Sequence, residues 1–350
     1  MDGLRLRVMQ PDAYRAWFDT ERGAIERRSP FHEPGWLEAM DRVARGRLAV
    51  VGVYHGERPV GAVPGFLARR GPFRLFGSPL RKTLTTYLGP VLASGVDVAE
   101  VLDACERFVR REWGVDYTEI TLREPPAGAL DASWRPMPRG TYCLDLTRGE
   151  DGLWAGLKSR CRGAIRKCEK LGLGVVPLLD VGVHAEILRQ TFARRGMQAP
   201  YSERFLASVL DLATAGLVSG WGAEYDRRII GNGLLLHDER EVHFLSGGTL
   251  SEYRGISSQT PLLWHAIASG ARSGRHVFDF AGRGVQGIDD FKAGFGPQSV
   301  DYWSASRAPR QVRVAERLAA RSSVALNQLG HMASALAPRS FGRQEAAGWG

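Results

Sequence analysis

Apolar and polar positions along the chain follow two periods, and each period predicts one kind of element. In residues 98–113 the apolar side chains recur at helical spacing, on Val98, Val101, Leu102, Cys105, Phe108 and Val109. Elsewhere two apolar runs flank the polar tetrapeptide of residues 55–58, which predicts a hairpin. The segment "YTEITL" at 117–122 predicts a strand. A turn and a short helix are expected in "SPFHEPGWLEAM", where Ser29, Pro30 and Pro34 interrupt the pattern.

The second half of the chain repeats this plan. It predicts, in order, a basic helix ended by a glycine, an apolar segment, a second helix, three strands, a third helix and a last strand, at 151–172, 173–179, 183–196, 219–248, 259–267 and 276–282. Proline and glycine concentrate at 124–140 between the halves. We therefore expect an α/β protein with mixed sheets (α+β), built from two similar domains at 1–140 and 141–306, with a tail at 307–350.

Charge sets the tail apart from the rest. It carries seven arginines and two glutamates, so +5 of the chain's net +9 lies there. Its apolar residues fall roughly on one helical face beside a stripe of arginines, which predicts a basic amphipathic helix at 311–332. Such a helix suits an anionic membrane surface, or it packs on the body of the protein. Because the basic excess lies mainly outside the folded pattern, nucleic-acid binding is not expected as the main role.

Composition indicates a soluble globular protein, with 44% hydrophobic and 24% charged residues. No apolar run approaches the roughly 20 residues of a membrane span, and the N-terminus has no apolar signal stretch, so we expect a cytoplasmic protein, peripheral at most to the inner membrane face. Four cysteines form no CxxC pair and the histidines are scattered. The sequence therefore predicts reduced thiols and no metal site.

One loop is typical of phosphate binding. In "YRGISSQTPLL", residues 253–263, Arg254 and Gly255 lead through a polar turn into a helix, whose N-terminal N–H groups attract anions. Ser257 and Ser258 either donate hydrogen bonds to a ligand or cap the helix. Side chains replace glycines here, so close backbone approach of a pyrophosphate is hindered.

Two other basic features are candidates for binding anions. Lys292 in "GIDDFKAGFG" either faces a cleft or lies on the surface, and Asp289 or Asp290 is its partner or a base. On the basic helix, every fourth residue is a cation, at Lys158, Arg162, Arg166 and Lys170. Like charges at this spacing repel each other, which favours an anionic partner. A solvated, charged helix face is the alternative.

Several segments resemble a known family. Tyr253 to Leu263 is similar to the phosphate loop of GNAT acyltransferases and departs from it at Ser257 and Gln259. Six segments occur in the order found in Fem-type (FemAB-like) peptidoglycan aminoacyltransferases and their GNAT relatives, some of which belong to exopolysaccharide loci. They are "SPFHEPGWLEA", "YLGP", "LWAGLKSRCRGAIRKCEKLG", "FLSGGTLSEYRGISSQTPLLWHAI", "FDFAGRG" and "GIDDFKAGFG". The resemblance spans residues 25–305, without the long helical insertion of some Fem proteins.

This resemblance implies two tandem GNAT-like domains and transfer of an acyl or aminoacyl group to an amine of a cell-envelope or polysaccharide precursor. The donor would be acyl-CoA or aminoacyl-tRNA, tRNA entering only as donor, with no tightly bound cofactor. The substrate would be a small or lipid-linked molecule with phosphate groups. Lys292 would be catalytic, and the substrate-binding residues would be Tyr87, Arg162, Arg166, Tyr253, Arg254 and Ser257.

Two alternatives remain open at this point. One is a CoA-dependent N-acyltransferase of an amino acid or amino sugar. The other is a catalytically idle binding module that recruits partners to the membrane through the tail.

Overall fold

The protein is described by a computed structural model covering residues 4–25, 27–81, 83–125 and 130–313. Its residues divide into two compact units, 1–307 and 308–350, and the fold below is that of the first. Apart from residues 311–313, the helix predicted at 311–332 lies outside the described residues. In the part of the chain that is described, no helix combines the length and the apolar character needed to cross a membrane.

A 13-stranded mixed sheet runs through residues 4–307, in the order β1-β2-β3-β4-β6-β13-β7-β12-β11-β10-β9-β8, with β5 paired to β3. The strands of the N-terminal half are β1 (Leu4–Met9), β2 (Arg47–His55), β3 (Arg58–Arg70), β4 (Phe73–Ser78), β5 (Val91–Leu92) and β6 (Tyr117–Leu122). Those that follow are β7 (Arg135–Asp145), β8 (Gly174–Pro177), β9 (Val218–Tyr225), β10 (Arg228–His237), β11 (Glu241–Thr249), β12 (Val277–Asp279) and β13 (Gln298–Arg307).

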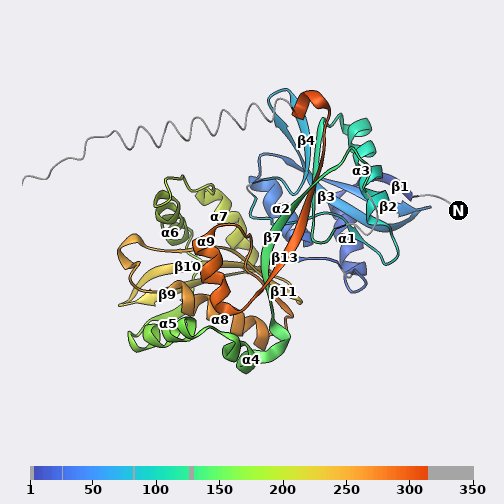
Figure 1. The fold of residues 1–350 in the computed structure, drawn as a ribbon. Coiled ribbons are helices and arrows are strands. Elements are labelled where there is room, and N and C mark those ends of the chain that lie inside the picture. Colours follow the sequence, from blue (N-terminus) through green and yellow to red (C-terminus); the bar gives the residue numbers. More distant parts are fainter. Residues whose placement is uncertain (1–3, 26, 82, 126–129, 314–350) are drawn as a thin grey trace, which may run out of the picture. The chain divides into compact units, whose positions relative to one another are not determined.

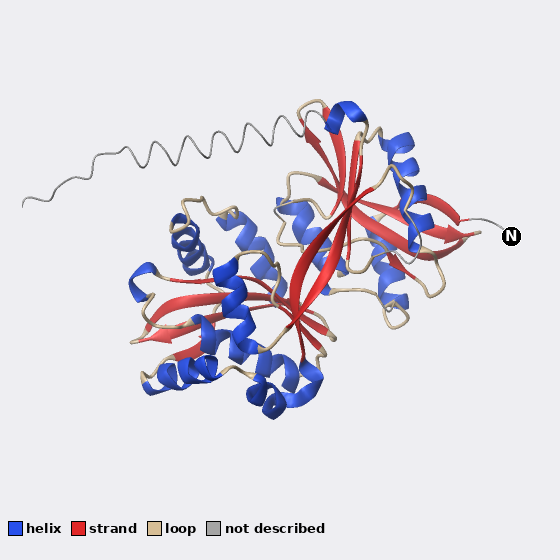
Figure 2. Cartoon of the chain, in the orientation of Figure 1, coloured by secondary structure: helices blue, strands red, loops and turns tan. Residues whose placement is uncertain are grey.

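Helices lie around the strands of each half (Figure 2). The α-helices are α1 (Pro11–Glu21), α2 (Pro34–Val43), α3 (Val98–Trp113), α4 (Gly149–Gly156), α5 (Ser159–Lys170), α6 (Val181–Ala193), α7 (Glu203–Leu210), α8 (Gln259–Arg272) and α9 (Gln286–Lys292). The predicted mixed α/β fold is confirmed, including the hairpin of β2 and β3 and the helix α3.

Strands β7 and β13 join the halves. Figure 1 shows them running side by side from one half to the other. β13 pairs with β7 through Gln298↔Cys143 to Ser306↔Arg135, and with β6 through Trp303↔Leu122 to Arg307↔Thr118. The last strand of the unit therefore lies between a strand of the N-terminal half and one that leads into the C-terminal half.

The halves also share a hydrophobic core. One cluster of buried side chains contains Phe31, Trp36 and Tyr87 from the N-terminal half together with Leu206 and Leu234 from the C-terminal half. Burial of such large side chains stabilises each by about 1.5–3 kcal/mol relative to exposure. The contact between the halves is therefore part of the fold's stability.

One predicted element was wrong. Residues 151–172, expected as a single helix, form α4 and α5, separated at Leu157, whose ψ of 141° is extended. Arg162 donates from its guanidinium to the carbonyl oxygens of Trp154, Ala155 and Leu157. This side chain thus satisfies carbonyls that the end of α4 leaves without helical partners, and the break is stabilised by a residue of the next helix.

Candidate active site

The site begins where two parallel strands separate. β11 pairs with β12 only at Glu241↔Val277, Val242↔Phe278 and His243↔Asp279. Opposite β10 the register shifts at Leu245, which is an extra residue between Phe244 and Ser246. A bulge of this kind bends the strand. The remaining residues of β11, from Phe244 to Thr249, line a cavity of about 570 Å³.

Two glycines let helix α6 and strand β10 approach this part of β11. A Cβ atom on Gly248 would lie 2.1 Å from Oγ1 of Thr191 on α6, and one on Gly247 would lie 2.6 Å from the carbonyl oxygen of Asn232. Both distances are shorter than any real contact allows. Glycine is therefore required by the packing on either side of the strand.

Two polar residues at the end of the loop, Ser258 and Gln259, tie helix α8 to the sheet. Ser258 Oγ lies 2.8 Å from Thr249 Oγ1, and the Gln259 amide donates to the carbonyl oxygens of Gly248 and Asn232 at 2.6 and 3.0 Å. Ser258 stands at the N-cap position with helical backbone angles, and its side chain makes no cap hydrogen bond. The N-terminus of α8 is therefore held by contacts to β10 and β11.

The lining of this cavity, here named the cationic cavity, carries four cations, at Arg194, Arg195, Arg254 and Lys292, and no described acidic residue lines it. Arg194 donates to the Thr249 carbonyl oxygen at 2.9 Å and to Ser251 Oγ at 3.0 Å. Burial, then the charges of Arg254 and Arg195, lower the pKa of Arg194. Unbalanced positive charge of this kind favours an anionic ligand.

Lys292 is 6% exposed and points at the turn that follows β12. Its ammonium donates to the carbonyl oxygens of Ala281 and Gly282, the second at 2.6 Å, and lies 5.8 Å from the centre of the Tyr142 ring. Burial lowers the pKa of Lys292, while the nearby carboxylates of Asp289 and Asp279 act in the opposite direction. The predicted partner Asp289 accepts instead from the Gly284 amide.

Asp279, which the sequence analysis left out, is the centre of a buried network. Its carboxylate accepts from Tyr87 Oη at 2.8 Å, from the Ala281 amide at 2.7 Å and from Thr141 Oγ1. Ala281 has a positive φ of 54°, which is uncommon for a residue with a side chain. Asp279 therefore fixes the turn whose carbonyl oxygens hold Lys292. Its place between two phenylalanines in "VFDFAG" is the only sequence signal of its burial.

The network continues along β11. His243 Nε2 lies 2.9 Å from Glu241, and Glu241 accepts from Arg123 of the N-terminal half. Burial alone would raise the pKa of Glu241, but the bond to His243 and the charge of Arg123 outweigh it and hold the pKa at about 2. These residues connect the halves directly beneath the site.

A second cavity, here named the neighbouring cavity, has a volume of about 390 Å³. It is lined by residues of both halves, and it shares Tyr201, Phe244, Leu245 and Ala281 with the cationic cavity. Burial raises the pKa of Tyr201 to about 12, so its hydroxyl is neutral near pH 7. The two cavities are therefore adjacent, and these four residues line both of them.

The predicted site residues fall into two groups. Arg254, Ser257 and Lys292 line the cationic cavity, and Tyr87 lies beneath it, its hydroxyl bonded to Asp279. The other three lie outside both cavities: Arg162 bonds the end of α4, Arg166 lies over the Trp154 ring at 5.8 Å, and Tyr253 contacts Arg228. Their role in substrate binding stays a prediction.

Ser246 was not predicted. Its hydroxyl is buried and has no hydrogen-bond partner among the described residues, and the residue lines the cationic cavity just after the Leu245 bulge. Buried hydroxyls are nearly always paired. We therefore count Ser246 among the candidate site residues.

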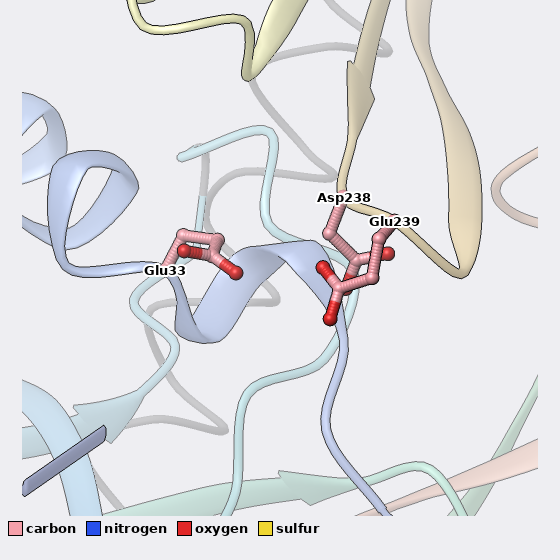
Figure 3. Close-up of side chains that lie close together, drawn as sticks. All are labelled: Glu33, Asp238 and Glu239. Atoms are coloured by element: carbon pink, nitrogen blue, oxygen red, sulfur yellow. The ribbon is translucent and has the colours of Figure 1, made fainter. Parts of the chain in front are cut away.

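Three carboxylates outside the cavities also lie close together, those of Glu33, Asp238 and Glu239 (Figure 3). Arginines already neutralise them. Arg28, with a side chain 1% exposed, contacts Asp238 at 2.8 Å and also Glu239, and Arg22 contacts Glu33 at 2.6 Å. The group is an ion-pair network that links α2 to the turn between β10 and β11.

Comparison with known proteins agrees with this geometry. Residues 156–293 match the family described as acetyltransferase (GNAT) domain. That range contains β11, α8, β12 and Lys292, and hence every residue that lines the cationic cavity. A search among curated protein sequences finds no significant match.

Solved structures with a similar fold cover most of the chain. FemX has a TM-score of 0.67 at 12% identity, over 85% of this chain and 96% of its own. A tandem GNAT protein from the clavulanic acid biosynthesis pathway has a TM-score of 0.56 at 16% identity, over 87% of this chain and 98% of its own. The C-terminal domain of a putative lysylphosphatidylglycerol synthetase from Agrobacterium fabrum has a TM-score of 0.55 at 12% identity. The match covers 88% of this chain and 96% of that domain. Residues 156–293 therefore match a GNAT domain, in a chain that has the fold of FemX and of tandem GNAT proteins.

Proposed function

We propose that the protein is an N-acyltransferase that moves an acyl group from acyl-CoA to an amine of a cell-envelope or polysaccharide precursor. The observation that carries the proposal is the cationic cavity, which holds four cations, opens at the separation of β11 and β12, and meets a second cavity at a shared wall.

The donor's phosphates would lie at the N-terminus of α8. Arg254 and Ser257 line the cavity there, and the positive end of the helix dipole attracts anions. The edge of β11 beyond His243 has no β12 partner, so its backbone groups can bond the amides of an extended donor arm. The thioester would then lie near Leu245 and Ser246.

The reaction then needs a neutral amine, an oxyanion site and a leaving thiol. The amine nitrogen attacks the thioester carbon, a C–N bond forms, and the carbonyl electrons move to oxygen. The Ser246 hydroxyl and the Lys292 ammonium are the donors placed to stabilise that oxyanion. When the C–S bond breaks, the thiolate takes the proton that the amine gives up, and the Tyr201 hydroxyl lies on the wall between the two ligands.

The acceptor would occupy the neighbouring cavity. Its lining is rich in hydroxyl groups and also includes charged residues of both signs, namely Arg81, Thr83, Thr85, Thr86, Glu119, Thr121, Arg139, Tyr302 and Ser304. Arg81 and Glu119 form an ion pair at 3.0 Å. Such a lining suits a hydroxylated acceptor such as an amino sugar or a sugar-linked precursor.

The N-terminal half has a similar pair of parallel strands, β4 and β6, and acidic residues rather than cations lie at the start of the helix that follows β4. The helix after β4, α3, begins at Asp97, whose carboxylate accepts from the Ala99 amide at 2.8 Å, and Glu100 lies in its first turn. Carboxylates at a helix start repel phosphate. We therefore assign the donor to the C-terminal half alone.

Calorimetry of the full chain with CoA tests the proposal. We expect CoA to bind and to raise the melting temperature, and Arg254→Glu to weaken binding by at least tenfold because it inverts one of the four charges. Arg70→Glu is the matched control, since Arg70 is exposed at the end of β3 in the other half. If CoA does not bind, or if both variants weaken it equally, the proposal is wrong.

A further inference from the structure

The exposed and the buried residues that line the cationic cavity differ in polarity. Its exposed members are Arg194, Arg195, Arg254 and Ser257, all polar. Every aliphatic or aromatic member is buried or half-buried: Leu188, Phe192, Tyr201, Phe244, Leu245, Ile256, Leu263, Phe280, Ala281, Ile288 and Phe291. The cavity therefore has a cationic mouth and a predominantly apolar interior.

This interior is built into the core of the C-terminal half. Leu263 and Phe280 are each 1% exposed and belong to one buried cluster, and Leu188 at 2% belongs to another. Phe280 packs against Phe295 at 5.6 Å, and Phe291 packs against the same ring at 5.5 Å. Packed side chains of this kind form a rigid wall, so the interior does not depend on a ligand to take shape.

Charge restricts what can enter. No described acidic side chain lines the cavity, so the ammonium of an aminoacyl group would lose its hydration among cations and apolar side chains. The one cation in the interior, Lys292, already donates to two carbonyl oxygens. An acyl group that enters the interior is therefore best uncharged.

We infer that the acyl group transferred by this site is a long, uncharged hydrocarbon chain, so that the donor is a fatty acyl thioester and neither an acetyl nor an aminoacyl donor. The inference rests on the proposed function and narrows it. The cationic mouth holds the phosphates of the donor, and the apolar interior excludes water from its chain.

Affinity as a function of chain length is the direct test. We would titrate the full chain by calorimetry with CoA, acetyl-CoA, hexanoyl-CoA, dodecanoyl-CoA and succinyl-CoA. Burial of hydrocarbon predicts an affinity that rises roughly tenfold for every two added methylene groups until the interior is full. Succinyl-CoA should bind no better than acetyl-CoA.

Two tryptophan variants provide the control, one within α9 and one at the residue just before it. Ile288 is half-buried and lines the interior, whereas Val285 is 58% exposed and does not line it. Ile288→Trp should remove most of the gain from chain length while CoA itself binds as before, and Val285→Trp should leave both unchanged. Circular dichroism and the melting temperature without ligand verify that both variants fold.

The outcomes separate the inference from the function beneath it. Binding of CoA with no dependence on chain length, or with a preference for succinyl-CoA, overturns the inference and leaves the proposed function standing. Absence of binding by every thioester and by CoA overturns both. An unchanged chain-length gain in a folded Ile288→Trp variant also contradicts the inference, because the chain would then lie elsewhere.

Discussion

A buried ammonium needs acceptors, and Lys292 finds two of them in the backbone of the turn at Ala281 and Gly282. That turn is itself held by Asp279, which accepts from the Ala281 amide. The position of the charge is therefore set by a residue that does not line either cavity. Because this side chain is already fixed, little conformational entropy is lost when a ligand binds.

Replacing Lys292 tests its role. Lys292→Met keeps the length of the stem and removes the charge, so turnover, measured as thiol release from an acyl-CoA in the presence of amino sugars, should fall on the order of 100-fold. Lys170→Met, at an exposed lysine of α5, is the control and should have full activity. Unchanged turnover in a folded Lys292→Met variant would refute a role in the reaction.

His32 predicts a pH dependence of stability. Its Nδ1 accepts from the Ser29 amide and its Nε2 faces the Leu88 carbonyl oxygen, so the neutral ring is fully bonded. Burial lowers its pKa to about 4, whereas an unfolded chain has about 6.5. The unfolded state therefore binds the proton first, and the free energy of unfolding decreases by about 3 kcal/mol as pH falls from 6.5 to 4.

Chemical denaturation at pH 7 and pH 4.5 measures this effect. His32→Gln should be less stable at pH 7 but should lose less free energy of unfolding on acidification. Part of that loss should remain, because burial also lowers the pKa of His237 to about 4. His55→Gln, at an exposed residue, should retain the full dependence. An identical loss in His32→Gln and the unaltered protein would exclude His32 as a cause.

Sequence can mark residues near a recognisable helix start, such as Arg254 and Ser257, but not residues defined by distant partners. Arg254, Ser257 and Lys292 do line one cavity. Arg162 and Arg166 were chosen because they share a helical face, but spacing cannot distinguish a ligand from the carbonyl oxygens of α4. Asp279 was missed because its partner Tyr87 lies 192 positions away in the sequence.

At the scale of elements, the site depends on β11. This strand packs closely against β10 and α6, and beyond His243 it has no β12 partner. The alternation of apolar residues predicted β11, but it did not predict where β12 would stop pairing with it. Beyond that point α6 packs against Gly248 and α8 against Gly247, and tertiary contacts of this kind leave no periodic pattern in the sequence. Elements could be predicted from sequence here, and the cavity between them could not.

Two glycines near the cavity should respond differently to alanine. Gly248→Ala places a Cβ atom 2.1 Å from Thr191 Oγ1, so the free energy of unfolding should fall by about 1–3 kcal/mol. Gly255, in the loop before α8, has no atom within 4 Å of its Cβ position, so Gly255→Ala should be nearly as stable as the unaltered protein. Urea denaturation of both variants makes the comparison.

Adding Thr191→Ala to Gly248→Ala should restore part of the lost stability, because it removes the hydroxyl that clashes. A single variant Gly248→Ala with unchanged stability would show that α6 can move away from β11. A strongly destabilised Gly255→Ala would show that the loop is more closely packed than its surroundings indicate.

At the scale of the whole molecule, the halves are joined by a shared core, by the Tyr87–Asp279 bond and by Arg123 with Glu241. The pairs β4–β6 and β11–β12 are both parallel, and the division into two similar domains at 1–140 and 141–306 stays a prediction. The exchange of β13 between them left no trace in sequence periodicity. A strand's pattern shows that one face is buried but does not identify its neighbours.

The tail supports one further prediction at this scale. Its arginine excess suggests binding to anionic lipid, so the full chain should sediment with vesicles that contain phosphatidylglycerol more than with phosphatidylcholine vesicles, and a variant lacking residues 308–350 should not. CoA binding by the shortened variant is the control for folding. Equal sedimentation of both forms would mean that the tail does not bind lipid.

The place of β13 has a consequence for synthesis on the ribosome. β6 and β7 emerge long before residues 298–307, so the edge of each that pairs with β13 stays open while most of the C-terminal half is being made. Unpaired edges are the part of a sheet that other chains can join. A nascent chain interrupted before residue 298 would therefore expose two open edges in the middle of its sheet, where a finished chain has none.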